Sequence, residues 1–163
     1  MNCSLTQDYL KQVLFYDPNA GVFKHLRVSG KARLNATAGF IKDGYILIGV
    51  DNIIYRAHRL AWLYVYGYLP PAEIDHINGL RGDNRIINLR LATRSQNTSN
   101  REAQKNNKCG LKGVSFEKQT CMWKAQICFN GKNRNLGRFY TKESAHSAYA
   151  AAALKHHGEF ARF

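Results

Sequence analysis

Apolar residues recur at helical or alternating spacing along most of the chain, and they predict a series of short elements. Residues 5–14 have the periodicity of a helix, with Thr6 as its N-cap. Hairpins are predicted over residues 15–23 and 39–55, because short apolar runs flank turn-forming residues. A second helix follows and ends at Gly67, before two prolines that cannot continue it.

A strand, a long turn and a returning strand are predicted next. Asp75-His76 closes a short apolar run, and Leu89 to Thr93 forms the second strand after a turn that contains two glycines. Ser95 is expected to cap a short helix that carries Asn97. The residues that follow are polar and basic, which predicts a linker and a domain boundary near Asn106.

Beyond this linker, alternating residues predict three antiparallel strands and one helix. Asn130-Gly131 is a strong signal for a hairpin between the last two strands. Thr141 is expected to cap an alanine-rich helix that ends at Gly158, and the small side chains let this helix lie close to the sheet. The three predicted strands span residues 113–117, 123–129 and 133–139.

The chain is strongly basic, and its charge is uneven. Its net charge is +13, from 24 basic and 11 acidic residues. Residues 1–100 hold 12 basic and 7 acidic residues, whereas residues 101–163 hold 12 basic and 4 acidic residues. This excess favours double-stranded DNA as a partner over a merely soluble basic surface, and it predicts that the C-terminal part binds more strongly.

Two other classes of protein are disfavoured by composition. No apolar run approaches the roughly 18 residues of a membrane span, and no early basic-then-apolar pattern marks a secretory signal. We therefore expect no membrane partner and a cytoplasmic location, in a bacterial host if the protein is phage-encoded. None of the four cysteines forms a Cys-x-x-Cys pair, which disfavours a zinc knuckle.

Three side chains around the predicted turn suit phosphodiester hydrolysis, which requires a base, a cation on the scissile phosphate and ligands for that cation. His76 suits the base because the ordinary histidine pKa of about 6.5 lies near operating pH. Asp75 and the side-chain carbonyl of Asn97 are hard oxygen donors, which suit Mg²⁺ or Mn²⁺. Each residue alone has an ordinary structural explanation, but their combined order favours a nuclease site.

The region contains four motifs in order: Asp75-His76, Asp83-Asn84-Arg85, Asn88-Leu89 and Ser95-Gln96-Asn97. Together they resemble the ββα-metal site of HNH homing endonucleases, in the phage variant in which Asn replaces the last His. The resemblance implies that His76 is the general base and that Asp75 and Asn97 are metal ligands. It also implies that Asn88 is the structural asparagine of the catalytic set, with Asn84 competing for that role.

The resemblance covers about residues 45–101 and sets the expected architecture. The fold class is α+β, with an HNH nuclease domain over residues 1–105 whose ββα-metal core spans about 70–101. A small three-stranded antiparallel sheet packed on one helix follows over residues 106–163. Basic side chains of the first domain are expected to contact the DNA backbone. They are Arg56, Arg59, Arg81, Arg85, Arg90 and Arg94.

The C-terminal segment contains Lys112-Gly-Val-Ser, Trp123-Lys-Ala-Gln-Ile, Leu136-Gly-Arg-Phe and Ala145-x-x-Ala-Tyr-x-x-Ala-Ala. With these motifs in this order, about residues 109–163 resemble the Apetala-type, ethylene-response-factor DNA-binding domain. It implies a sheet face that reads DNA, although several arginines of that family are replaced here. By position, the DNA-facing residues are Lys112, Ser115, Glu117, Lys124, Gln126, Asn133 and Asn135.

These observations predict a monomeric, site-directed DNA endonuclease of the phage homing type that hydrolyses phosphodiester bonds with a divalent metal. One alternative is a DNA-binding regulator that has lost cleavage and keeps the HNH fold as a scaffold. Another is a nuclease that serves phage packaging or recombination. Residues 28–38 are basic as well, and they are either a loop or an arm that contacts the DNA backbone.

Overall fold

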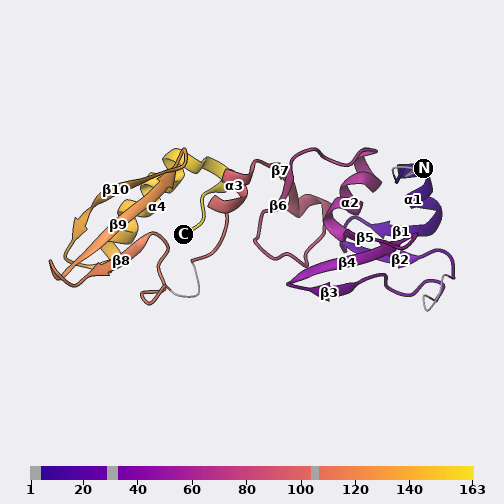
Figure 1. The fold of residues 1–163 in the computed structure, drawn as a ribbon, viewed down its shortest axis with the longest axis horizontal. Coiled ribbons are helices and arrows are strands. Elements are labelled where there is room, and N and C mark those ends of the chain that lie inside the picture. Colours follow the sequence, from indigo (N-terminus) through magenta and orange to yellow (C-terminus); the bar gives the residue numbers. More distant parts are fainter. Residues whose placement is uncertain (1–4, 29–32, 104–106) are drawn as a thin grey trace. The chain divides into compact units, whose positions relative to one another are not determined.

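The computed structural model describes residues 5–28, 33–103 and 107–163. The chain divides into two compact units, Met1–Ala92 and Thr93–Phe163, whose elements are labelled in Figure 1. The domain boundary expected near Asn106 falls outside the described residues, as does the middle of the basic segment 28–38. No helix among the described residues is long and apolar enough to span a membrane.

The described part of the first unit consists of small antiparallel sheets with two α-helices. Strand β1 pairs with β2, β4 lies between β3 and β5, and β6 pairs with β7. The helices are α1 (Gln7–Val13), α2 (Ala57–Tyr66) and a short 3-10 helix, η1 (Ile86–Asn88). The strands are β1 (Leu14–Asp17), β2 (Val22–His25), β3 (Phe40–Lys42), β4 (Tyr45–Val50), β5 (Ile53–Arg56), β6 (Glu73–His76) and β7 (Leu89–Ala92).

Most of these elements were predicted, and their ends have the expected physical causes. The Thr6 hydroxyl accepts a hydrogen bond from the Tyr9 backbone N–H at 3.3 Å and caps α1. Helix α2 ends at Gly67, whose φ of 83° is in the left-handed region. The strand β3 was not separated from β4 within the predicted 39–55 hairpin, because Phe40, Ile41 and Lys42 are all exposed and show no alternation of burial.

One hydrophobic core joins the helices and sheets of the first unit. Leu10 of α1, Leu60 of α2 and Ile48 of β4 are almost completely buried in it. Ile74 of β6 and Leu89 of β7 belong to the same cluster. The β6–β7 hairpin is therefore anchored through one apolar side chain on each strand, which holds the neighbouring Asp75-His76 segment in place.

The β1–β2 turn packs tightly on the long loop between β6 and β7. Gly21 in this turn has a φ of 70°, and a Cβ added there would lie 2.4 Å from the Arg85 backbone nitrogen. The buried Tyr16 hydroxyl of β1 donates a 2.6 Å hydrogen bond to the Asn84 backbone carbonyl. Only glycine fits this approach, so the N-terminal hairpin determines where the loop at Asn84–Arg85 can lie.

The described part of the second unit has a three-stranded antiparallel sheet in the order β10-β9-β8, covered by one long helix. This matches the predicted arrangement, including the Thr141 cap of the helix and its end at Gly158. The elements are α3 (Arg94–Ser99), β8 (Val114–Glu117), β9 (Met122–Phe129), β10 (Lys132–Phe139), α4 (Lys142–His157) and the 3-10 helix η2 (Gly158–Phe160).

The predicted cap of α3 was wrong by two residues. Thr93, and not Ser95, is the N-cap, because its hydroxyl accepts from the Gln96 backbone N–H. The Gln96 side chain in turn accepts from the Thr93 N–H at 2.8 Å, which completes a capping box. Asn97 lies on this helix, as expected.

The two faces of the C-terminal sheet differ sharply. Val114, Ala125 and Ile127 are buried, and they pack in the apolar clusters that include Ala145 and Tyr149 of α4. The alternate residues point to the opposite face, where no described helix covers them. Overall the described chain is a mixed α/β structure with small antiparallel sheets, consistent with the expected α+β class.

We predict that Gly21→Ala destabilises the first unit by about 2–4 kcal/mol, because left-handed backbone strain adds to a clash with the Arg85 backbone. The measurement is chemical denaturation of the full chain. Gly131→Ala is the matched control, since its φ is also 70° but nothing lies within 4 Å of the added Cβ. We expect a loss of about 1 kcal/mol there, and equal losses at both positions would contradict the proposed packing.

Candidate active site

The candidate site is built on the β6–β7 hairpin. The register pairs Asp75 with Arg90 and His76 with Leu89. Asp75 and His76 are both buried, with exposed fractions of 3% and 5%. Two adjacent polar residues at the end of a buried strand require specific partners, because buried polar groups without hydrogen bonds are costly.

The partner of Asp75 is Arg90 on the facing strand. The Arg90 Nε and one terminal nitrogen each lie 2.9 Å from the Asp75 Oδ2 atom. The two side chains are only 4% and 13% exposed, so the ion pair is largely removed from water. Removing one partner of such a pair typically costs about 3–5 kcal/mol, because the other charge stays buried. Arg90 therefore holds the carboxylate in place within the hairpin.

His76 lies among other rings. Its ring centroid is 5.0 Å from that of His58, edge to face at 87°, and 6.2 Å from that of Tyr45. Burial lowers the pKa of His76, although its contacts with Asn84 and Asp75 oppose this shift. Burial and the neighbouring His76 lower the pKa of His58 to about 3. Both imidazoles are therefore neutral near pH 7, and a neutral imidazole is the form that accepts a proton.

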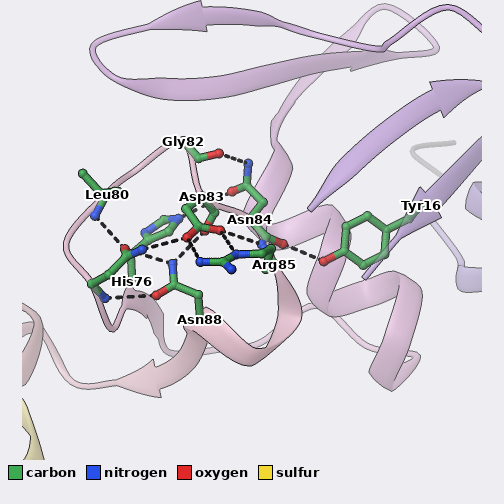
Figure 2. Close-up of polar contacts among 9 residues, drawn as sticks. Tyr16, His76, Leu80, Gly82, Asp83, Asn84, Arg85 and Asn88 are labelled. Atoms are coloured by element: carbon green, nitrogen blue, oxygen red, sulfur yellow. Dashed lines mark hydrogen bonds and ion pairs between the residues drawn. The ribbon is translucent and has the colours of Figure 1, made fainter. Parts of the chain in front are cut away.

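The orientation of His76 depends on Asn84. The Asn84 side-chain Oδ1 lies 3.5 Å from the His76 Nε2 atom. The amide nitrogen of Asn84 donates to the Gly82 carbonyl at 3.2 Å, which determines which end of the amide faces the imidazole. Because a carbonyl oxygen only accepts, this arrangement favours the tautomer with its proton on Nε2. Figure 2 shows Asn84 between His76 and Tyr16.

Asn88 differs from Asn84, because its described side-chain hydrogen bonds are with the loop between β6 and β7. Its Oδ1 accepts from the Asn78 N–H at 3.0 Å, and its amide nitrogen donates to the Asn78 side-chain carbonyl at 3.0 Å. The same nitrogen donates to the Asp83 carbonyl at 2.9 Å. Asn88 thus bonds across the turn (Figure 2), and its place in the catalytic set stays a prediction, whereas Asn84 contacts His76.

Asp83 completes the loop. It accepts from the Arg85 Nε at 2.9 Å and a terminal nitrogen at 2.7 Å, and from the Asn78 amide at 2.7 Å. The hydrogen bond from Arg85 is the main reason that the pKa of Asp83 falls to about 2. The half-exposed Arg85 guanidinium is thus already paired with Asp83. For its predicted contact with DNA, Arg85 must either break this ion pair or bind Asp83 and a phosphate together.

The remaining arginines predicted to contact DNA occupy varied positions. The guanidiniums of Arg56 and Arg81 both lie over the Tyr45 ring, at 4.6 and 5.0 Å from its centroid. Arg59 donates to the Pro70 carbonyl at 2.8 Å and is half-buried. Arg94 is exposed on α3. Arg56, Arg81 and Arg94 are thus the members of the set that solvent reaches most readily, whereas Arg90 faces inward.

The oxygen donors present fit a weakly held hard cation by their chemistry. Asp75 supplies one carboxylate, and Mg²⁺ commonly takes only one or two protein oxygens, with water and phosphate completing its shell. The positive charge of Arg90 lowers the attraction of Asp75 for a free cation. No group of three or more His, Cys, Asp or Glu side chains among the described residues is placed to hold a metal. Asn97 belongs to the second unit, and its ligand role stays a prediction.

Six of the seven residues predicted to face DNA in the C-terminal unit share one surface, which we name the outer face of the β10-β9-β8 sheet. The register places Ser115 beside Lys124, Gln126 beside Asn135, and Asn133 beside Cys128. Glu117 lies on the same face, where it pairs with Arg138 of β10, and this contact lowers the pKa of Glu117 to about 2.

Lys112 is the exception. Its ammonium donates to the Ser99 carbonyl at 2.5 Å, and burial lowers its pKa to about 8.

Sequence reasoning missed Tyr16 and Tyr45 as parts of the site. Tyr16 is 68 residues away from the carbonyl it bonds, and it is also a core residue, so nothing local distinguishes it. His58 carries no motif signal, and its buried contact with His76 places it next to the candidate base. Asn84, which competed with Asn88 for the structural role, lies beside the His76 ring.

We predict that Asn88→Ala lowers the free energy of unfolding by about 2–4 kcal/mol, because three hydrogen bonds are lost and partners inside the loop are left unsatisfied. Denaturant titration measures the change. Ile87→Ala is the control, since this neighbouring side chain is 81% exposed and should change stability by less than about 0.5 kcal/mol. An equally mild effect of both variants would exclude Asn88 as the organiser of the loop.

A known family matches the part of the chain that contains the β6–β7 hairpin. The family model described as HNH endonuclease matches residues 55–99, from the end of β5 through α3. Protein 3.8 of Escherichia phage T7 is 35% identical over 109 residues, covering 66% of this chain and 89% of that protein. An uncharacterized HNH endonuclease, L560, of Acanthamoeba polyphaga mimivirus is 33% identical over 122 residues, covering 74% of this chain and 62% of that protein.

No solved structure matched the chain significantly. The chain extends beyond the HNH match on both sides, and it spans less than two thirds of the mimivirus relative. The similarity to the T7 protein covers most of that relative's length. The chain therefore belongs to the same family as phage T7 protein 3.8, and residues 55–99 form an HNH endonuclease domain, which supports nuclease activity on DNA.

Proposed function

We propose that the protein is a metal-dependent, site-directed DNA endonuclease of the homing type, in which His76 is the general base. The observation that carries this proposal is the buried Asp75-His76 pair at the end of β6, with His76 aimed by Asn84, inside the HNH match. A histidine that is held neutral and has a defined tautomer is suited to activating water for attack on a phosphodiester.

The proton transfer follows from the surroundings of His76. The Asn84 Oδ1 atom accepts from Nε2, so the lone pair of the neutral ring resides on Nδ1. We assign to Nδ1 the removal of a proton from the attacking water. His58 behind the ring stays neutral, so it adds no positive charge that would oppose the developing imidazolium. Asp75, adjacent in sequence, favours that imidazolium by its negative charge.

Asp75 and Asn97 are the proposed ligands of Mg²⁺ or Mn²⁺. When bound, such an ion would neutralise charge on the scissile phosphate and on the leaving oxygen. Asp75 is kept in position for this by Arg90. Because Arg90 partly neutralises the carboxylate, we expect the protein alone to hold the cation weakly and to require the phosphate oxygens of DNA to complete the site.

Target selection is assigned to the outer face of the β10-β9-β8 sheet. This face is polar and exposed, and the second unit contains the more basic part of the chain, residues 101–163. A small sheet of this kind can enter the major groove, where side chains reach the edges of bases. The resemblance to Apetala-type domains supports the assignment. Lys124 and Gln126 occupy the central strand, so they are the best placed to read the sequence.

We predict that His76→Ala abolishes cleavage of long phage DNA in the presence of Mg²⁺ and leaves DNA binding nearly unchanged. The assay incubates the protein with DNA, with Mg²⁺ or with a chelator, and sequences the ends that are produced. Chelation should stop cleavage by the unmodified protein, and Mg²⁺ or Mn²⁺ should restore it. Asn84→Ala should lower the cleavage rate about 10- to 100-fold, since the base loses its orienting partner.

The pattern of ends tests the homing assignment in the same experiment. One dominant cleavage site supports a homing enzyme, whereas many sites or preference for DNA ends would favour packaging or recombination. Persistence of cleavage in His76→Ala would show that the base is misassigned. If the unmodified protein binds DNA and never cuts it, the chain is a regulator on an HNH scaffold.

We further predict that the double variant Lys124→Ala, Gln126→Ala loses sequence preference. The ratio of its cleavage rate at the preferred site to its rate at other sites should fall at least about tenfold. Both side chains lie on the outer face, so the fold should be preserved. Lys155→Ala with His156→Ala is the control, because both residues are exposed on α4, which packs on the opposite face. An equal effect of both double variants would rule out the outer face as the surface that selects the target.

A further inference from the structure

We propose that one surface of the β3–β4–β5 sheet in the first unit, the one that points away from the core, binds the DNA duplex beside the cleavage site. This inference rests on the proposed endonuclease function. No comparison assigns a role to this face, and β3 and β4 lie outside the HNH match. We name it the flanking face, and its members are Phe40, Lys42, Leu47, Gly49, Ile54 and Arg56.

The register shows that these side chains share one face. Ile46, Ile48 and Val50 of β4 point to the core, so the residues between them point outward. Leu47 is paired with Phe40 on one side and with Arg56 on the other, which forms a row across the sheet. Gly49 is paired with Ile54, and Tyr45 with Lys42, which forms rows on either side of the first.

The composition of the flanking face suits a nucleic acid. Phe40 and Ile54 are large apolar side chains, yet they are 51% and 61% exposed. Lys42 and Arg56 are positively charged, and none of the outward residues on these three strands is acidic. Apolar groups contact thymine methyl groups and sugars, while cations bind phosphates, so this mixture is complementary to a DNA groove and its rims.

Tyr45 connects the flanking face to the candidate base. Its ring centroid is 6.2 Å from that of His76, and the guanidiniums of Arg56 and Arg81 lie over the same ring. A guanidinium that stacks on an aromatic ring keeps the N–H groups at its edge for phosphate oxygens. Arg56 comes from the flanking face and Arg81 from the loop after β6, so the cluster joins this face to the loop that aims His76.

The occupant that fits is duplex DNA, because a sheet surface of this size presents side chains to a groove while its cations reach the adjoining phosphates. The flanking face would thus hold the substrate next to the hydrolysed bond. The outer face of the β10-β9-β8 sheet would select the target elsewhere on the same substrate. Two surfaces on separate units give the enzyme an affinity that neither surface supplies alone.

Gly49 offers a test that leaves the fold intact. A Cβ added there meets nothing within 4 Å, and its φ is not in the left-handed region. Gly49→Glu and Gly49→Lys therefore place opposite charges at one point on the flanking face. The same pair at Ile41 is the matched control, since Ile41 lies on β3 of the same sheet, is 77% exposed and pairs with the inward-facing Ile46.

The measurement is the dissociation constant of each full-length variant for a short random-sequence DNA duplex, by fluorescence anisotropy without Mg²⁺ at physiological salt. Screening over about 8 Å at this salt limits the effect to charges near the bound DNA. We expect Gly49→Glu to bind at least about tenfold more weakly than Gly49→Lys, and the Ile41 variants to differ by less than about twofold. Arg56→Gln should also reduce the slope of log affinity against log salt by about 0.9.

The proposal would be overturned if the dissociation constants of the Glu and Lys variants had the same ratio at position 49 as at position 41. The proposal would also be wrong if Gly49→Glu left DNA binding unchanged but weakened self-association, measured by analytical ultracentrifugation. The flanking face would then be an interface between two copies of the chain. Where a charge variant at Gly49 does not fold, Phe40→Ser and Ile54→Ser are used in its place. We expect these variants to bind DNA more weakly, and unchanged affinity would contradict the proposal. Because no cleavage is measured, failure of the endonuclease assignment would be detected separately, in the Mg²⁺ assay.

Discussion

The site depends on the hydrogen bonds by which Asn88 closes the loop between β6 and β7. This loop has few apolar side chains that could hold it by packing, so polar contacts must determine its path. Asn88 binds Asn78 near the start of the loop and the Asp83 carbonyl near its end. Once the loop is closed, Asn84 is presented to His76, and the Tyr16 hydroxyl fixes Asn84 from the other side. The position of the candidate base is therefore a property of the whole first unit.

The same arrangement explains why His76 is supported by neutral groups. A charged neighbour behind the imidazole would either hold its proton permanently or repel the proton gained during reaction. Burial keeps His58 neutral near pH 7, Tyr45 lies beside the His76 ring, and the guanidiniums of Arg56 and Arg81 lie over Tyr45. The cations thus stack on an aromatic neighbour of the candidate base.

Sequence patterns predicted most elements, because periodicity and turn chemistry are local. The Asn130-Gly131 hairpin, the end of α2 at Gly67 and the alternation on β9 are all of this kind. The pattern did not separate β3 from β4 within the predicted 39–55 hairpin, because β3 has no buried residue. It also assigned Thr93 to the returning strand, so Ser95 was taken as the cap of α3. In the site, the motif singled out Asp75 and His76 as candidates, and their roles stay predictions. It did not find the contact of Tyr16, which joins residues 68 positions apart, and it gave no sign that Asn84 and His76 lie side by side.

The ion pair between Asp75 and Arg90 has a consequence for how such proteins diverge. The Asp75 and Arg90 side chains are both largely removed from water, and each offsets part of the cost of burying the other's charge. In a relative that lacks the aspartate, the buried arginine would lose this compensation, so we expect the two positions to change together. The residue that faces position 75 across the hairpin would therefore report whether the carboxylate proposed here as a metal ligand has been kept.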